Sequence, residues 1–168
     1  MPDARNGKHM MRILKTLFFV IIGPGSVVVY IPYFLISYVG LIGFSKIDYF
    51  QLSGMFLFAA GVAIALWCFY NFIFSGKGTP VPIDPPKHLV VCGLYRYTRN
   101  PMYLGILLIL GGEALFFESY VMLIYAVCMF CLFQAFIIGF EEPSLKVRFG
   151  KEYEEYCQSV PRWLFRSR

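Results

Sequence analysis

The polar residues best suited to chemistry gather in two short segments beside long apolar runs. The first is Tyr95–Gly105, YRYTRNPMYLG, which holds two arginines, three tyrosines and an Asn-Pro pair. The second is Glu141-Glu142, at the end of the following apolar run. Asn100 is a favoured N-cap residue, and Pro101 suits the first position of a helix. The free N–H groups of a helix that starts here would attract a carboxylate or a phosphate.

These residue types suit a ligand with several functional groups. Arg96 and Arg99 would add positive charge at the helix start, and the two glutamates would bind hydroxyl or ammonium groups. The tyrosines at 95, 97 and 103 could enclose a flat ring or a cation. S-adenosylmethionine, with its carboxylate, ribose, adenine and sulfonium, is such a ligand. Tyrosines and arginines also form ordinary membrane-interface anchors, and on the residues alone we favour that explanation.

The elements that must position these segments are membrane-spanning helices. The 168 residues are 58% hydrophobic and 15% charged, whereas a soluble domain carries about 25% charged residues. Residues 16–45 and 49–76 contain no Asp, Glu, Lys or Arg, and residues 100–140 contain only Glu113 and Glu118. A span needs about 20 apolar residues, so the third run predicts a helical hairpin that turns at Glu118-Ser119.

The predicted fold is therefore an all-α integral membrane protein with about four transmembrane helices. We expect spans at roughly 13–42, 49–74, 101–117 and 120–140, the last two forming the hairpin. Prolines and glycines at 23–25 and 32 predict a bent first span, and we consider a lining for a lipid-side opening and an ordinary kink. We expect a single domain over 1–168, with two spans in 1–75 and the cofactor-binding loop, hairpin and C-terminal helix in 76–168.

Charge placement predicts the orientation. Of the 15 Lys and Arg residues, 14 fall before the first span, in the middle loop or in the tail, and only Lys46 falls elsewhere. The positive-inside rule then places both termini in the cytoplasm. We expect a multi-pass protein of the cell (inner) membrane whose net charge of +5 favours anionic membrane lipids, and no nucleic-acid partner.

Two further patterns concern the cysteines and the tail. Cys128 and Cys131 form a C-x-x-C pair inside an apolar run with no histidine near, so we expect helix packing and no metal site. In the tail, Phe149, Tyr153, Tyr156 and Val160 follow helical spacing. That spacing predicts a cytoplasmic amphipathic helix which lies on the membrane or covers a pocket.

The order of these motifs resembles a family of membrane methyltransferases. HLVVCGLYRYTRNPMYLG, then a hairpin, then EEPSLKVRFGKEYEEYCQSVPRW is similar to the isoprenylcysteine carboxyl methyltransferases and the phospholipid N-methyltransferases. The resemblance covers roughly the C-terminal half. It implies a methyltransferase that uses S-adenosyl-L-methionine on a lipophilic substrate, isoprenylcysteine-like or phospholipid-like, which enters from the bilayer. It assigns no catalytic residue and no oligomeric state.

The resemblance also implies which residues hold the cofactor, with Glu142 taking the ribose or amino group and the start of the third span taking the carboxylate. By position the pocket residues are Leu89, Val90, Tyr95, Asn100, Pro101, Tyr103, Glu141 and Glu142.

Three departures from the family pattern bear on activity. Asn100 and Lys87 stand where the family usually has histidine, and asparagine cannot titrate. Residues 121–140 contain no arginine, although prenylcysteine enzymes carry one late in the penultimate helix. This difference leaves lipid amines and other lipophilic nucleophiles open as methyl acceptors.

Two alternatives remain beside the methyltransferase. One is a small proton-coupled exporter that uses Glu113, because an ionisable residue inside a span is a functional candidate. Exporters assembled from inverted pairs need a weak Lys/Arg bias, which this chain lacks. The other is a non-catalytic membrane partner protein on the same scaffold, which the altered Asn100 keeps open.

Overall fold

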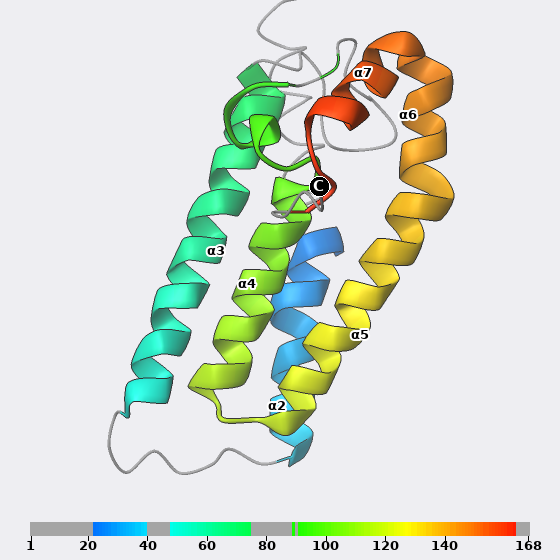
Figure 1. Cartoon of the computed structure of the whole chain (residues 1–168). Coiled ribbons are helices and arrows are strands. Elements are labelled where there is room, and N and C mark those ends of the chain that lie inside the picture. The colour runs from blue at the N-terminus through cyan, green and yellow to red at the C-terminus, as the bar shows by residue number, and fades with distance from the viewer. Residues whose placement is uncertain (1–21, 40–47, 75–88, 90, 164–168) are drawn as a thin grey trace, which may run out of the picture.

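The computed structural model describes residues 22–39, 48–74, 89 and 91–163, and every regular element within them is a helix. The predicted all-α class is confirmed. Four long helical segments run side by side, and the C-terminal helices close one end of the bundle (Figure 1). In chain order the elements are η1 (Ser26–Tyr30), α2 (Ile31–Val39), α3 (Tyr49–Phe74), η2 (Gly93–Arg96), α4 (Pro101–Phe116), α5 (Tyr120–Phe136), η3 (Ile137–Glu141), α6 (Glu142–Phe149) and α7 (Lys151–Ser159).

Two of these helices are long and apolar enough to cross a membrane. They are Tyr49–Asn71 within α3 and the continuous helix Tyr120–Phe149, whereas Ile22–Tyr38 and Pro101–Phe116 are apolar but shorter. Large apolar side chains such as Tyr33, Phe56 and Ile124 are exposed on the outer faces, as a hydrocarbon environment requires. The count of four spans stays a prediction.

Glycines let α3 and α4 approach until their backbones touch. A Cβ built on Gly61 would lie 2.6 Å from the carbonyl oxygen of Gly105, and one on Gly54 would lie 2.7 Å from that of Gly112. Gly54 and Gly61 are seven residues apart on α3, and Gly105 and Gly112 are seven residues apart on α4. Both contacts therefore fall on one seam of this antiparallel pair of helices. Small residues at such seams drive helix association in membranes. This seam fixes the depth of the α4 start beside the end of α3.

The hairpin turns where the sequence predicted. α4 ends at Phe116, Glu118 has a left-handed backbone with φ 48°, and the Ser119 side chain accepts a hydrogen bond from the backbone N–H of Met122 at 3.4 Å. Side-chain capping satisfies one of the free donors of the new helix. α5 therefore returns to the end of the bundle where α4 began.

Each of two π-helical turns ends two residues before a proline. η1 ends at Tyr30 before Pro32, and η3 ends at Glu141 before Pro143. A proline inside a helix lacks the N–H donor and clashes with the carbonyl of residue i−4, and a wider turn relieves the clash. The helix predicted to stop near Phe140 therefore continues into α6, and the π turn sets the direction of Glu141.

Some packing expectations are wrong. Cys128 and Cys131 are exposed on α5 and do not pack between helices. Small residues in 49–74 are expected to pack against a neighbouring helix. Gly54 and Gly61 are buried, but Ala59 and Ala63 are exposed. The apolar composition of α3 and α5 gives no strong periodicity, so the sequence could not indicate which side of either helix faces the bundle.

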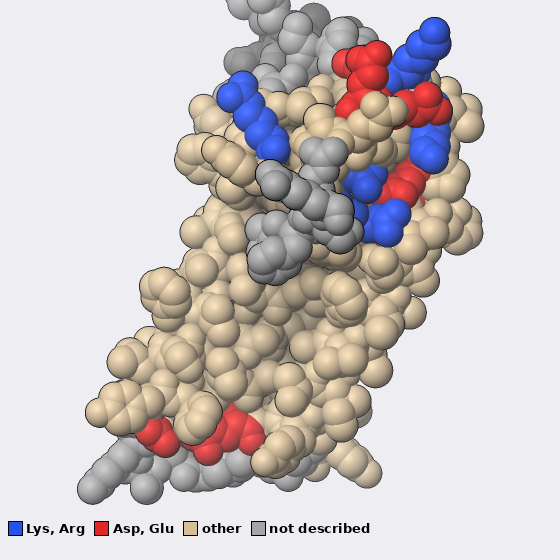
Figure 2. Space-filling model, in the orientation of Figure 1, with Lys and Arg blue, Asp and Glu red and all other residues tan. Residues whose placement is uncertain are grey.

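Among the described residues, Lys and Arg occur at one end of the bundle only, whereas acidic residues occur at both ends (Figure 2). The lower end in that view carries the acidic residues Asp48, Glu113 and Glu118, near the start of α3 and the end of α4. No Lys or Arg in the described ranges lies at that end. The six described Lys and Arg residues all lie at the end with η2, α6 and α7; they are Arg96, Arg99, Lys146, Arg148, Lys151 and Arg162.

Candidate functional site

The start of α4 meets the end of η3, as the hairpin predicted. The Tyr103 hydroxyl, in the first turn of α4, donates a hydrogen bond to Glu141 Oε2 at 2.8 Å. The Tyr103 ring also packs against Phe133 of α5, with ring centroids 4.9 Å apart. Among the described residues Tyr103 engages only one oxygen of Glu141, so the second oxygen is available to a ligand.

Glu142 has different partners from its neighbour. Arg162 binds it in a bidentate manner, from Nε to Oε1 at 2.8 Å and from the second guanidinium nitrogen to Oε2 at 2.9 Å. Arg99 approaches Oε1 at 3.1 Å. The hydrogen bond to Glu142 raises the pKa of Arg162 above its ordinary value. Because both oxygens of Glu142 are engaged, this carboxylate is an ion-pair partner in the structure.

Arg99 carries a donor that the protein does not use. Its guanidinium contacts Glu142 and the Cys157 sulfur, which lies 2.7 Å from the same terminal nitrogen. Its buried Nε has no hydrogen-bond partner in the described part of the chain. An unpaired buried donor is costly, so an anionic ligand group at this position would be stabilised.

Asn100 occupies the N-cap position, but its side chain does not cap the helix, which corrects the sequence prediction. The Asn100 Nδ2 group donates instead to the backbone carbonyl of Arg162 at 3.1 Å. The Thr98 hydroxyl donates to the same carbonyl at 3.0 Å. A side chain in this position must donate an N–H hydrogen bond, but it does not have to gain or lose a proton. Asparagine can therefore replace histidine here.

The C-terminal strap, Pro161–Trp163, is the part of the site that sequence reasoning missed. The Arg99 backbone N–H donates to the carbonyl of Pro161 at 2.9 Å, and the Trp163 Nε1–H donates to Gln134 Oε1 at 2.9 Å. The Trp163 ring lies 5.4 Å from the ring of Phe130 on α5. From the sequence, Arg162 is used only as one of the positive charges that predict the membrane orientation. The one sequence feature that could have indicated the strap is the Pro-Arg-Trp triplet that follows the amphipathic segment.

The tyrosines of the segment Tyr95–Gly105 lie in two different environments. Tyr95 is 8% exposed, and Tyr97 is 71% exposed, so Tyr97 does not help enclose a ligand. The Tyr156 hydroxyl of α7 donates to the backbone carbonyl of Tyr95 at 2.7 Å. Burial raises the pKa of the Tyr95 phenol well above its ordinary value, and Cys68 and Glu141 add to that shift. Tyr95 is thus a neutral wall beside Glu141.

Two of the remaining predicted site residues, Pro101 and Leu89, lie near these contacts. Pro101 is fully buried at the first position of α4. Leu89 packs against the buried cluster of Tyr153, Tyr156 and Val160 that covers this end of the bundle. Val90, Lys87 and His88 lie outside the described residues.

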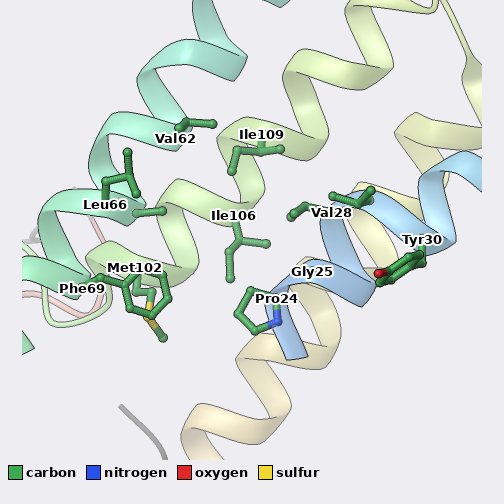
Figure 3. Close-up of a pocket in the computed structure, with 12 residues that line it drawn as sticks. Pro24, Gly25, Val28, Tyr30, Val62, Leu66, Phe69, Met102, Ile106 and Ile109 are labelled. Carbon is green, nitrogen blue, oxygen red and sulfur yellow. The ribbon is translucent and has the colours of Figure 1, made fainter. Parts of the chain in front are cut away.

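An apolar cavity of about 380 Å³ lies between η1, α3 and α4. Figure 3 shows Pro24 and Val28 facing Leu66 and Ile106 across it. Met102 lines the cavity and is followed directly by Tyr103, so neighbouring residues of α4 serve the cavity and the polar site. Pro24 and Gly25 of the predicted first span line this space, and the lipid-side opening stays a prediction. The cavity is lined by Pro24, Gly25, Val28, Val29, Tyr30, Val62, Ala65, Leu66, Phe69, Met102, Ile106 and Ile109.

Glu113 takes no part in this site. It lies three residues before the end of α4, at the opposite end of the bundle from Tyr103. Its Oε2 atom is buried without a hydrogen-bond partner among residues that the structure describes.

Comparison with known proteins agrees with this arrangement. A family model described as phospholipid methyltransferase matches residues 49–152 of the 168, which includes α3, the hairpin and both glutamates. No curated protein and no solved structure matches the chain. With more than half of its length matched, the chain belongs to the phospholipid methyltransferase family, a family of membrane methyltransferases.

Proposed function

We propose that this protein is an integral membrane methyltransferase that uses S-adenosyl-L-methionine on a lipophilic substrate entering from the bilayer. One observation carries the proposal: Tyr103 and Glu141 form a polar contact at the start of α4, directly beside Met102 of the apolar cavity. A polar donor site and an apolar acceptor site then share one turn of helix. Family membership supports the methyl-transfer chemistry.

The residues present fit the cofactor. Arg99 Nε and one oxygen of Glu141 have no partner among the described residues. The first offers a donor to a carboxylate, and the second offers an acceptor to a hydroxyl or ammonium group. Tyr95 supplies an apolar face with a neutral phenol. Of the residues that the sequence indicated, the proposed binding residues are Leu89, Val90, Tyr95, Asn100, Pro101, Tyr103 and Glu141. Glu142, also indicated by the sequence, is engaged on both oxygens by arginines and would support the site without contacting the cofactor.

The protein would act by positioning and by excluding water. S-adenosylmethionine, when bound, supplies a methyl group on a sulfonium, which is already activated toward a nucleophile. Tyr103 fixes the direction of Glu141, and the cluster of Tyr153, Tyr156 and Val160 shields this end of the bundle from water. Aligning the two reactants and excluding water from them can supply much of the rate enhancement. No side chain is therefore assigned as a general acid or base.

The cavity would hold an alkyl chain of the acceptor. Its lining is almost wholly apolar and includes Met102, the residue before Tyr103, so a chain lying in it would place an attached head group near the start of α4. The absence of arginine from residues 121–140 leaves no cation there for a substrate carboxylate, which favours a phospholipid-like amine over a prenylcysteine. The proposed setting is a cell membrane, with four spans and both termini in the cytoplasm.

Binding of S-adenosylmethionine to purified protein in detergent tests the cofactor. We expect calorimetry to detect binding by the wild type and a loss of roughly tenfold or more in Glu141→Gln, the scale of a charge-assisted hydrogen bond. Glu113→Gln makes the same chemical change at the far end of the bundle and should bind normally. Lack of binding by the wild type would overturn the proposal.

Product analysis separates the acceptors and the alternatives. A lipid extract incubated with labelled methyl donor should yield a labelled phospholipid amine, whereas label on an added prenylcysteine would point to the other acceptor class. Proton-driven efflux from vesicles, lost in Glu113→Gln, would instead support the exporter. Cofactor binding without methylation of either acceptor class would favour the non-catalytic partner.

A further inference from the structure

Glu141 and Glu142 are adjacent in sequence, but the structure gives them separate partners. Among the residues that the structure describes, Glu141 is held by one neutral hydroxyl, from Tyr103. Glu142 is held by two cations, with Arg162 on both of its oxygens and Arg99 on one. The Glu142 side chain is 14% exposed, so these ion pairs are largely shielded from water. A ligand that bound Glu142 would have to displace a bidentate arginine.

The partner of Glu142 belongs to the C-terminal strap, which is fixed at both sides of the site. On the α4 side, Thr98, Arg99 and Asn100 all donate hydrogen bonds to its carbonyls, at 3.0, 2.9 and 3.1 Å. On the α5 side, the Trp163 indole donates to Gln134 at 2.9 Å. The strap therefore connects α4 and α5 at the end where Tyr103 also contacts Phe133 and Glu141.

These contacts form a closed ring. The Glu142 carboxylate accepts hydrogen bonds from the Arg162 guanidinium, and the Arg162 carbonyl accepts one from the Asn100 side chain. Asn100 directly precedes the first turn of α4, which carries Tyr103. Tyr103 then returns to Glu141, which is covalently next to Glu142. Removing one member of a ring loosens the others, because each contact fixes the position of the next.

We infer that Glu142 anchors the strap through Arg162, and that Arg162 is a positioning residue that sets the geometry of Tyr103 and Glu141, the carboxylate that meets the ligand. This inference deepens the proposed function and rests on it for the identity of the ligand. It reassigns Glu142, which the family resemblance placed on the ribose or amino group of the cofactor.

The fluorescence of Trp163 reports directly on whether the C-terminal strap is docked. The chain has two tryptophans, Trp67 and Trp163, so Trp67→Phe leaves a single reporter in the strap. In that background we expect Arg162→Gln and Glu142→Gln to shift Trp163 emission to the red and to increase its quenching by acrylamide. Arg162→Lys should retain part of the docked signal because it keeps the charge. Glu152→Gln, on the exposed surface of α7, should leave the signal unchanged.

The same variants separate positioning from ligand contact. Arg162→Gln and Glu142→Gln should each weaken S-adenosylmethionine binding by roughly tenfold, with partial rescue by Arg162→Lys. The double variant should be no weaker than Glu142→Gln alone, because both changes break the same Arg162–Glu142 contact. Glu141→Gln should lose binding while Trp163 stays docked.

Three results would overturn the inference. In the first, Glu142→Gln loses binding while Trp163 stays docked, which would make Glu142 a ligand contact. In the second, Arg162→Gln releases Trp163 without changing the affinity, which would make the strap irrelevant to the site. In the third, neither variant moves the Trp163 signal. If the wild type itself does not bind S-adenosylmethionine, the proposed function fails, and the Trp163 signal still decides whether Glu142 anchors the strap.

Discussion

At the residue scale, the chemical type of a side chain matters less than the partner to which it binds. Asn100 illustrates this, because it occupies an N-cap position and yet donates to the carbonyl of Arg162. Tyr103 lies in the next turn of the chain and supplies the one donor to Glu141 that the described residues provide. Both side chains act as N–H or O–H donors, and neither needs to change its charge at neutral pH.

Removing the Tyr103 hydroxyl should loosen Glu141 without removing its charge. Tyr103→Phe keeps the ring against Phe133 and deletes only the hydrogen bond to the carboxylate. We expect affinity for S-adenosylmethionine to fall about fivefold to tenfold, which corresponds to one hydrogen bond of about 1–1.5 kcal/mol. Tyr97→Phe makes the same change at an exposed residue and should have no effect. Equal affinities for Tyr103→Phe and the wild type would contradict this role.

The identity of residue 100 should follow its capacity to donate. Asn100→Asp places a carboxylate against the Arg162 carbonyl, so we expect a loss of about 1–3 kcal/mol in the free energy of unfolding. Asn100→His restores an N–H donor, as in the family pattern, and should keep the strap docked. Thermal unfolding in detergent together with Trp163 emission measures both effects. A histidine variant less stable than the aspartate variant would refute the donor argument.

At the element scale, the sequence predicted helices well and their contacts poorly. The bounds of α3, the turn at Glu118 and the approach of Glu141 to the α4 start all follow from apolar run length and hairpin geometry. The π turns before Pro32 and Pro143 do not follow, because the prolines predict only that the helix must adjust. The strap was missed because its contacts join residues about 60 positions apart, and no local pattern records them.

Two adjacent glycines on α4 offer a matched test of the α3–α4 seam. A Cβ on Gly112 would lie 2.6 Å from the backbone nitrogen of Phe58, whereas one on Gly111 would meet nothing within 4 Å. We expect Gly112→Ala to destabilise the folded state by about 1–3 kcal/mol through overpacking. Gly111→Ala should be neutral or slightly stabilising, since alanine favours a helix. Denaturant titration in detergent compares the two, and equal stabilities would refute the close seam.

At the scale of the whole molecule, the positions of the charged residues and of the cavity distinguish the two ends of the bundle. The six described Lys and Arg residues share one end with the ring of contacts around Tyr103, and the acidic residues Asp48, Glu113 and Glu118 lie at the other. The cavity reaches from Met102 toward the middle of α3 and α4, so its polar neighbourhood is at the basic end. A water-soluble cofactor would then arrive from the cytoplasm and a lipid from the bilayer.

The orientation can be measured with single cysteines in whole cells or sealed vesicles. In a background with the five native cysteines replaced by alanine, Ser119→Cys marks the hairpin turn and Lys151→Cys marks the start of α7. The positive-inside rule places the basic end in the cytoplasm, so an impermeant maleimide added outside should label the first variant and label the second only after the membrane is opened. Outside labelling of both variants would indicate dual orientation and would favour the exporter. Labelling of the second variant alone would invert the protein and put the cofactor site on the side without cytoplasmic S-adenosylmethionine.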